Sequence, residues 1–360
     1  MINVTKTYLP PIDEYIIHLR EIWERSWVTN HGPIVQELEK KLKEYLEIKN
    51  IQFVSNGTIA LQIAIKALDL KGEIITTPFS YVATTTSILW ENCQPVFVDI
   101  EDKTFCIDAD KIEKSITKKT SAILATHCYG FPCDVLKIQA ISKKHKLKII
   151  YDGAHAFGVK INGKSIFEYG DISTLSFHAT KLFHTVEGGA VICNNSEIDK
   201  KIALLKSFGH LGDEHFIAGI NGKNSEFHAA MGLCNLPRVK DFVKKRKDIF
   251  ALYKKQLSGF PIKYPVIPEN IEYNYAYFPI IFETEKQLLK IKNKLSENNI
   301  NTRRYFFPSL NKLNYVKGNK CPVSEDISTR VLCLPMYQEL TKMDVKIIVK
   351  VMKMIDLQGF

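Results

Sequence analysis

The chain has 360 residues, of which 45% are apolar and 24% are charged, a composition that is ordinary for a globular protein and excludes a largely disordered one. This length exceeds that of one simple core, so we expect a large domain, residues 1–240, and a smaller one, residues 241–360. The formal net charge of +10 comes from lysines scattered along helical patterns. It argues against a nucleic-acid partner and suits an anionic small-molecule substrate.

Residues 35–235 alternate short strand-like runs with helical patterns. This alternation predicts an α/β domain built on a doubly wound, mostly parallel sheet of seven strands. The predicted strands are 51–55, 73–77, 95–100, 122–127, 148–152, 171–178 and 189–194, and the predicted helices between them include 58–68 and 135–146.

The pattern changes after Pro237. A long basic helical pattern at 238–257 is followed by a proline-rich stretch, a strand-like run at 274–283 and helical patterns at 286–298 and 343–355. These elements predict a smaller α+β domain that begins near residue 240.

Eight cysteines are spread along the chain without a C-x-x-C pair or a histidine at zinc-ligand spacing, so we expect no metal site. Several lie in apolar runs, which predicts buried free thiols in a reducing compartment. No apolar run approaches the ~20 residues needed to span a bilayer, and the chain begins without an apolar signal core. We therefore expect a cytoplasmic protein with no membrane partner.

Polar residues follow several of the predicted strands, where ligands bind in open α/β sheets. Asn56, Gly57 and Thr58 lie between a strand and a helix, where free N–H groups suit a phosphate. A plain helix cap explains them equally well. Asp152 ends a buried strand and needs a cationic or protonated partner, although a loop-capping carboxylate is the alternative. His155 follows it, and a lone histidine is more often a packing residue.

Lys181 lies in a loop of small, hydroxyl and histidine residues, five positions after Ser176. Most lysines are solvated, but one held in a partly desolvated pocket loses its proton more easily and becomes a nucleophile. Phe79 and Tyr81 follow the strand 73–77 and offer flat rings that could stack on a planar cofactor or pack in the core.

A phosphate cradle, a strand-end aspartate, a strand-end lysine and an aromatic ring together meet the needs of pyridoxal 5'-phosphate. This cofactor binds lysine as a Schiff base, carries a phosphate and places its ring nitrogen against an aspartate. A dinucleotide site would instead need G-x-G-x-x-G after the first strand, and the chain has no such motif there.

Five segments, SNGTIAL, TTPFSYVAT, YDGAHAFG, SFHATKLFHTVEGGAV and GINGKNSEFHAAMG, resemble those of the DegT/StrS-type sugar-nucleotide aminotransferases. The resemblance covers almost the whole chain. It implies the aspartate aminotransferase fold, fold type I, with a mixed, mostly parallel seven-stranded sheet in the large domain. It also implies that the protein is a pyridoxal-phosphate enzyme.

The resemblance implies catalytic roles for three residues. Lys181 would hold the cofactor covalently and move the proton between cofactor and sugar carbon, Asp152 would pair with the pyridinium nitrogen, and His155 would lie near the phenolic oxygen or the ring face. Tyr81, or else Phe79, would stack on the ring.

The phosphate would be held by Gly57, Thr58 and Ser176, and completed by Asn221 or Lys223 of a second subunit. The resemblance therefore implies an obligate homodimer with shared active sites.

The implied substrates are L-glutamate, as amino donor, and a keto sugar on a nucleoside diphosphate. Relatives with histidine in place of Lys181 perform dehydration, so the lysine favours transamination. The lysine loop is similar to that of enzymes acting on 4-keto sugars, and we expect conversion of dTDP-4-keto-6-deoxyglucose to dTDP-4-amino-4,6-dideoxyglucose. The alternatives are a 3-keto isomer, a UDP-linked 4-keto sugar, and a non-catalytic regulatory protein of the same fold. The expected substrate contacts are Tyr8, Thr29, Asn30, His184, Arg304 and Tyr305.

Overall fold

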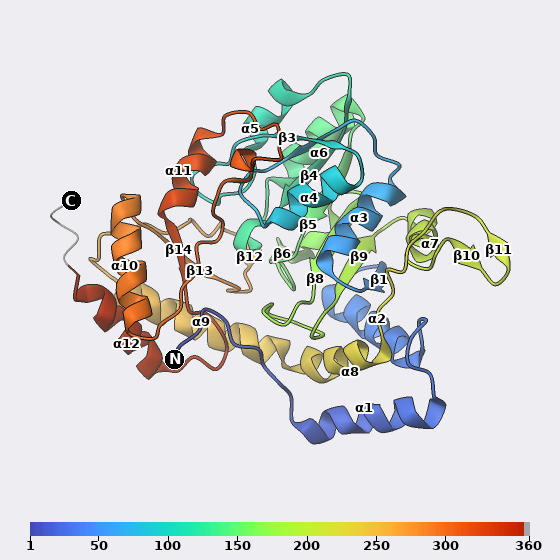
Figure 1. Cartoon of the computed structure of the whole chain (residues 1–360), viewed down its shortest axis with the longest axis horizontal. Coiled ribbons are helices and arrows are strands. Elements are labelled where there is room, and N and C mark those ends of the chain that lie inside the picture. The colour runs from blue at the N-terminus through green and yellow to red at the C-terminus, as the bar shows by residue number, and fades with distance from the viewer. Residues whose placement is uncertain (356–360) are drawn as a thin grey trace.

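The computed structural model describes residues 1–355. Its central feature is one seven-stranded sheet in the order β1-β9-β8-β5-β4-β2-β3 (Figure 1). The strands are β1 Asn50–Val54, β2 Glu73–Thr76, β3 Gln94–Phe97, β4 Thr120–Thr126, β5 Lys148–Asp152, β8 Ile172–Ser176 and β9 Gly189–Cys193. All seven predicted strands are present, and the predicted fold class is confirmed.

The sheet is mixed because β9 runs against both of its neighbours, whereas the other adjacent pairs are parallel. Gly189, the first residue of β9, pairs with Ser176 at the end of β8 and with Val54 at the end of β1. The chain between β8 and β9, residues 177–188, therefore stays at the carboxyl edge of the sheet. This arrangement puts the Lys181 loop at the edge where ligands bind in such folds.

Helices cover both faces of the sheet because both faces are apolar, as in other largely parallel sheets. Ile74 and Ile150 pack into a cluster on one face, while their neighbours Ile75 and Ile149 join another cluster on the opposite face. This is the alternation expected of extended strands. The helices of this part of the chain are α2 Pro33–Leu46, α3 Gly57–Ala67, α4 Val82–Trp90, α5 Ala109–Ile112, α6 Val135–His145, α7 Ser196–Leu205 and α8 Glu226–Asn235.

The C-terminal part of the chain has a hydrophobic core of its own. An antiparallel pair, β13 Phe278–Ile281 and β14 Val331–Leu334, packs there against helices that include α9 Val239–Gln256, α10 Glu285–Glu297 and α12 Lys342–Lys353. Thr284 and Thr341 start α10 and α12 with capping boxes, which satisfy the first free N–H groups of a helix. The predicted helices 286–298 and 343–355 correspond closely to α10 and α12, within the described residues.

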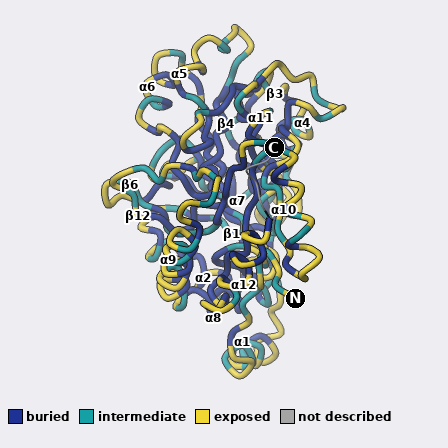
Figure 2. Tube along the Cα trace, turned by 90° about the vertical axis from the view of Figure 1, so that its left-hand side faces the viewer, coloured by how far each residue is buried: buried dark blue, intermediate teal, exposed yellow. Residues whose placement is uncertain are grey.

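The helix α9 joins the two cores, because Phe242 packs with the large sheet and Tyr253 with the C-terminal core. Ile2 pairs with Ile300, so the first residues also lie against the C-terminal part. The domain boundary near residue 240 stays a prediction. Figure 2 shows the buried interior and the exposed outer loops, with helix α1 Ile12–Arg25 set at one end of the molecule.

Several shorter elements complete the fold. Helix α11 Pro322–Arg330 leads into β14, and two-residue strands form small ribbons: β6 Lys160–Ile161, β7 Lys164–Ser165, β10 His210–Leu211, β11 Glu214–His215 and β12 Ile271–Glu272. Every cysteine is buried and unpaired, as predicted. Within residues 1–355 no helix is both long and apolar enough to cross a membrane.

Candidate active site

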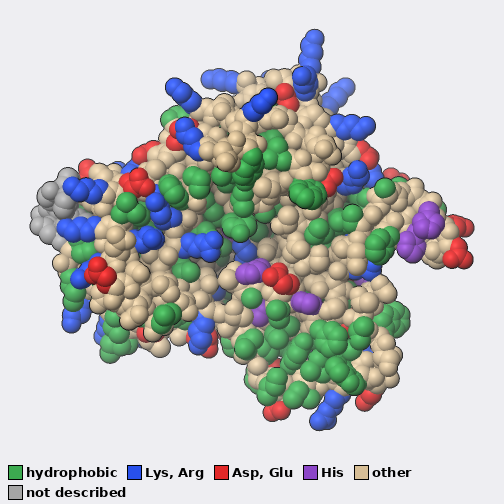
Figure 3. Space-filling model, viewed as in Figure 1, with side chains coloured by type: hydrophobic (Ala, Val, Ile, Leu, Met, Phe, Trp, Pro, Cys, Tyr) green, Lys and Arg blue, Asp and Glu red, His purple; other side chains and the backbone are tan. Residues whose placement is uncertain are grey.

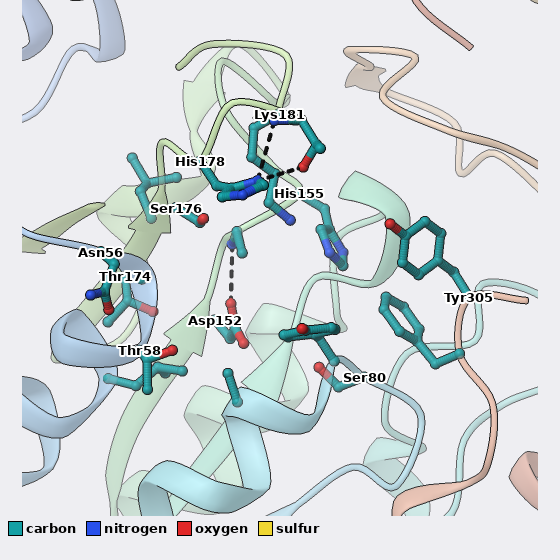
Figure 4. Close-up of a pocket in the computed structure, with 18 of the residues that line it drawn as sticks. Asn56, Thr58, Ser80, Asp152, His155, Thr174, Ser176, His178, Lys181 and Tyr305 are labelled. Carbon is teal, nitrogen blue, oxygen red and sulfur yellow. Dashed lines mark hydrogen bonds between the residues drawn. The ribbon is translucent and has the colours of Figure 1, made fainter. Parts of the chain in front are cut away.

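A cavity of about 550 Å³ lies at the carboxyl edge of the sheet. One wall comes from the ends of β1, β2, β5 and β8 and from the loop 177–188, and the other from Tyr277, Arg303, Tyr305 and Phe306 (Figure 4). Eight of the residues expected at the site line this cavity: Gly57, Thr58, Tyr81, Asp152, His155, Ser176, Lys181 and Tyr305.

The start of α3 forms one corner of the cavity. Asn56 caps the helix, and its side-chain oxygen accepts a hydrogen bond from the Ile59 N–H at 2.9 Å. Since the first N–H groups of a helix have no intrahelical partner, those of Gly57 and Thr58 remain for a ligand on the cavity wall. The hydroxyls of Thr58 and Ser176 belong to the same corner (Figure 4). The same segment can therefore cap the helix through Asn56 and bind a phosphate through the N–H groups of Gly57 and Thr58.

Two glycines allow this corner to form. A Cβ on Gly57 would lie 2.9 Å from the Cβ of Ser176, and one on Gly189 would lie 2.5 Å from the backbone carbon of Asn56. Both distances are too short for a side chain. Glycine at these positions lets the start of α3 rest directly on the ends of β8 and β9.

Asp152 ends β5 and is buried beneath the cavity floor. One carboxylate oxygen accepts a hydrogen bond from the Thr84 hydroxyl at 2.7 Å, and the other accepts from the Ala154 N–H at 3.1 Å. Burial raises the pKa of Asp152, while these two hydrogen bonds and the Lys181 charge oppose the rise. A cation placed against this carboxylate would keep it ionised.

Lys181 reaches the cavity from a loop that several contacts hold in place. Its N–H donates to the His178 carbonyl at 2.9 Å, and the Thr7 hydroxyl donates to the Ala179 carbonyl at 3.1 Å. The amine Nζ lies 3.5 Å from the Tyr277 hydroxyl. Burial lowers the pKa of Lys181 to about 8; Asp152 opposes the change and Arg303 adds to it. An appreciable fraction of this amine is therefore neutral near neutral pH.

Rings surround the space between Lys181 and Asp152. His155 stacks on Phe306, with centroids 5.5 Å apart and planes at 12°. Burial and the Lys181 charge lower the pKa of His155, so its ring is neutral. Tyr81 lines the cavity and is half exposed, whereas Phe79 is fully buried in the core. Of the two aromatic candidates, Tyr81 is the one placed to face a ligand.

Arg304 does not line the cavity. Its guanidinium lies 2.6 Å from a Glu285 carboxylate oxygen and donates to the Thr329 carbonyl at 3.0 Å. Arg303 lines the cavity instead. The reason is the pairing of Arg303 with Cys333 of β14, since consecutive side chains of extended backbone point to opposite sides.

The other expected substrate contacts lie elsewhere in this chain. His184 is buried, with Nε2 2.7 Å from the Tyr8 carbonyl oxygen, and it fastens the N-terminal segment to the lysine loop. Thr29 and Asn30 lie between α1 and α2 and do not reach the cavity wall. The substrate-binding roles of these four residues stay predictions.

Asn221 is exposed and is not part of the cavity wall of its own chain. A residue that serves a second subunit needs to be exposed on a single chain. Lys223, the competing candidate, has its Nζ 4.4 Å from the ring centroid of Phe208. Their role at a partner's phosphate also stays a prediction.

Several residues of the cavity wall were not predicted from the sequence. They are Ser80, His178, Glu187, Tyr277, Arg303 and Phe306. His178 and Glu187 lie in segments already singled out and could have been named from the loop alone. Tyr277 and Phe306 carried no such signal, because an aromatic residue in an apolar run is most often a core residue.

The residues present fit pyridoxal phosphate. The free N–H groups at the start of α3 suit its phosphate, the buried Asp152 carboxylate suits its protonated ring nitrogen, and the Lys181 amine suits its aldehyde. Among residues 1–355, no group of three or more histidine, cysteine, aspartate or glutamate side chains is placed to hold a metal ion.

A family profile described as the DegT/DnrJ/EryC1/StrS aminotransferase family matches residues 12–353. Over 348 residues the chain is 44% identical to the dTDP-4-amino-4,6-dideoxy-D-glucose transaminase of Shigella dysenteriae, covering 94% of this chain and 95% of that protein. Among solved structures, that of DesI in the presence of its TDP-sugar product has a TM-score of 0.94 at 26% identity, covering 98% of this chain and 92% of the other. The structure of NtdA from Bacillus subtilis with bound cofactor PMP has a TM-score of 0.87 at 30% identity, covering 95% and 82%.

Proposed function

The chain belongs to the DegT/DnrJ/EryC1/StrS aminotransferase family, and on that basis we propose that it transfers an amino group to C-4 of a 4-keto-6-deoxy sugar carried by a nucleoside diphosphate. It is a pyridoxal-phosphate-dependent sugar aminotransferase. The proposed acceptor is dTDP-4-keto-6-deoxyglucose, the proposed product is dTDP-4-amino-4,6-dideoxyglucose, and the proposed donor is L-glutamate. The name of the relative at 44% identity supports this choice of sugar and nucleotide.

One observation supports the proposal above all others. Lys181, Asp152 and the start of α3 share a single cavity, although they come from three separate parts of the chain. An amine, a carboxylate and a phosphate cradle in one space are what this chemistry requires. A regulatory protein that only keeps the fold would not need an amine whose pKa burial lowers to about 8.

Pyridoxal phosphate, when bound, supplies an aldehyde for amines and a ring that accepts electrons from the adjacent carbon. The residues of the chain supply orientation and proton transfer. Asp152 would hold a positive charge at the base of the cavity, because its buried carboxylate is oriented by two hydrogen bonds. Lys181 can take up a proton at Nζ and return it, because its pKa of about 8 lies near physiological pH.

Arg303 is the proposed anchor for the anionic substrates. It lines the cavity, and its guanidinium packs 4.7 Å from the ring centroid of Tyr305. The planar fork of arginine suits a carboxylate or a phosphate. Glutamate and the nucleotide sugar both carry such groups, so Arg303 takes the place first assigned to Arg304.

We propose that the active enzyme is a homodimer with shared sites. Large apolar side chains are exposed along α1 and the adjoining segments, where Figure 3 shows them gathered on one end of the molecule. They are Leu9, Ile12, Ile17, Trp23, Trp27 and Val28. A second copy of the chain would cover them. Asn221, or Lys223, would then complete the phosphate site of the partner.

We further place the enzyme in the cytoplasm. Its eight cysteines are unpaired, the state that a reducing compartment maintains. Its proposed donor, glutamate, is a small metabolite of that compartment.

The proposed function is tested by incubating the purified holoenzyme with L-glutamate and a panel of nucleotide sugars. The panel contains dTDP-linked 4-keto and 3-keto 6-deoxy sugars and a UDP-linked 4-keto sugar, and the products are read by mass spectrometry and proton NMR. We expect amination of the dTDP-4-keto sugar at C-4. Preferred turnover of the 3-keto or UDP-linked sugar would contradict the assignment, and no turnover of any sugar would contradict the function itself.

A further inference from the structure

A chain of three buried hydroxyl groups ends on the Asp152 carboxylate. The Thr84 hydroxyl lies 2.7 Å from the carboxylate oxygen Oδ2, the Ser80 hydroxyl lies 2.7 Å from that of Thr84, and the Thr126 hydroxyl lies 3.0 Å from that of Ser80. These residues come from α4, from the loop after β2 and from the end of β4. All four side chains are buried.

The directions of the hydrogen bonds in this chain follow from the number of protons. An ionised carboxylate only accepts hydrogen bonds, so the single hydroxyl hydrogen of Thr84 is donated in a hydrogen bond to Asp152. Ser80 must then donate to Thr84, and Thr126 must donate to Ser80. Each link strengthens the next through polarisation in a low-dielectric interior. The whole chain therefore favours the charged form of Asp152.

This arrangement opposes the effect of burial on the same group. Burial favours the neutral carboxylic acid, whereas hydrogen bonds to the charged form favour the carboxylate. A protonated Asp152 would offer a hydrogen to the cavity instead of a negative charge. The hydroxyl chain also fixes the plane of the carboxylate, because Thr84 and the Ala154 N–H hold one oxygen each.

We propose that Thr84, supported by Ser80 and Thr126, is a positioning residue that holds Asp152 ionised and aimed at the cofactor ring nitrogen. This inference rests on the proposed function. It adds a role for Thr84, Ser80 and Thr126, whose hydroxyls contact Asp152 and one another.

Thr85 offers a matched control for Thr84. It is the next residue of the same helix, it is equally buried, and its hydroxyl has no hydrogen-bond partner within the described part of the chain. Thr85→Val therefore removes a buried hydroxyl without breaking a hydrogen bond, whereas Thr84→Val removes the one that reaches Asp152. Thr84→Ser keeps that hydroxyl and loses only a methyl group.

The experiment compares each variant with wild type in three quantities. They are the dissociation constant of pyridoxal phosphate, measured by absorbance titration of the apoenzyme, and the kinetic constants kcat and KM. We expect Thr84→Val to weaken cofactor binding about tenfold or more and to lower kcat about 10- to 100-fold, with both KM values within about twofold of wild type. Thr84→Ser and Thr85→Val should stay within about threefold of wild type in all of these quantities. Equal cofactor affinity in Thr84→Val and Thr85→Val would overturn the proposal.

A second variant covers the case in which Thr84→Val fails to fold. Ser80→Ala leaves the Thr84 bond in place and breaks the next link, so cofactor affinity should fall about threefold or more. An affinity equal to that of wild type would overturn the role of the chain. The cofactor titration needs no sugar, so its outcome can be distinguished from failure of the sugar assay. Failure of wild type on every keto sugar would refute the function and leave the affinity comparison intact.

Discussion

Lys181 carries the amine on which the proposed reaction depends, and its surroundings determine the pH at which that amine is free. Burial lowers its pKa to about 8, and the neutral, nucleophilic form dominates above that value. We predict that the rate of cofactor attachment to the apoenzyme rises with pH, reaches half of its maximum near pH 8, and levels off about one pH unit above that value. Stopped-flow absorbance above 400 nm measures this rate. A pH-independent rate between pH 6 and 9 would contradict the prediction.

Replacement of the same residue gives the matching control. Lys181→Ala should abolish transamination and the absorbance above 400 nm that borohydride bleaches. The thermal unfolding midpoint should change by less than a few degrees, because the loop is held by backbone contacts and by neighbouring residues. More than a trace of turnover in this variant would refute the assigned role of the lysine.

The adjacent residues Arg303 and Arg304 should respond to replacement in different ways. Arg303 lines the cavity, whereas Arg304 is engaged by Glu285 and the Thr329 carbonyl. Arg303→Met should raise KM for an anionic substrate about tenfold or more, since a charge-assisted hydrogen bond is lost. Arg304→Met should lower stability while KM stays near that of wild type. Steady-state kinetics and thermal unfolding separate the two, and a reversed pattern would contradict the anchor role of Arg303.

Among the secondary-structure elements, α2 is tied to the end of α7 by a buried ion pair and to the sheet by a hydrogen bond. Glu39 of α2 lies 3.2 Å from the Lys206 amine and accepts a hydrogen bond from the Phe53 N–H of β1 at 2.7 Å. Burial raises the pKa of Glu39, but Lys206, His31 and the Phe53 N–H outweigh it, so the pKa lies below its ordinary value. The pair therefore stabilises the fold above the ordinary pKa of a carboxylate. This contribution is lost as the pH falls through the lowered pKa of the folded state.

We predict that Glu39→Gln lowers the free energy of unfolding by about 3–5 kcal/mol, because it leaves the Lys206 charge buried without a counter-charge. Urea unfolding at pH 7 measures the change. Glu37→Gln on the same helix is the control, since Glu37 pairs with Lys41 at the surface. That change should cost about 0–1 kcal/mol. Equal losses in the two variants would show that burial of the pair does not matter.

The strands and long helices were predictable from the sequence because each carries a strong local pattern. The run 148–152 places three residues with apolar bodies between Lys148 and the carboxylate of Asp152, and it forms β5 as expected. The antiparallel direction of β9 was not predictable, because a short apolar run has the same pattern in a parallel and in an antiparallel strand. Ribbons such as β10–β11 have two residues in each strand and are too short for any periodicity.

At the site, residues that end strands were predictable and residues brought by tertiary contacts were not. Asp152 and Lys181 lie where the chain leaves the sheet, so their place followed from topology. The choice between Arg303 and Arg304 depends on the pairing with Cys333, a contact thirty residues away that sequence spacing does not reveal. The hydroxyl chain to Asp152 joins three separate segments and was hidden for the same reason.

For the whole molecule, shared sites make a prediction about mixed dimers. Lys181→Ala and Asn221→Asp should each be inactive alone, the second because an aspartate repels the partner's phosphate. A heterodimer of the two contains one intact site if Asn221 serves the opposite subunit. Refolding an equal mixture should therefore restore about a quarter of wild-type activity, as random pairing in a two-fold dimer requires.

The mixed sample is compared with each variant refolded alone, and size-exclusion chromatography with light scattering gives the mass. Mixing without recovery, in a sample that is dimeric, would show that each site is complete within one chain. If Lys223 completes the site instead, Lys223→Glu and not Asn221→Asp should complement Lys181→Ala.

The two walls of the cavity come from different stretches of the chain. The groups that the reaction requires are therefore separate in sequence from residues that face the substrate. Strand ends and the lysine loop hold the amine, the carboxylate and the phosphate cradle, whereas Arg303, Tyr305 and Phe306 form the facing wall. Arg303 and Tyr305 face the substrate side of the cavity, whereas Phe306 also supports His155 through ring stacking. A combinatorial library restricted to residues 303 and 305 should therefore change the choice of sugar while the lysine loop and the strand ends stay as they are.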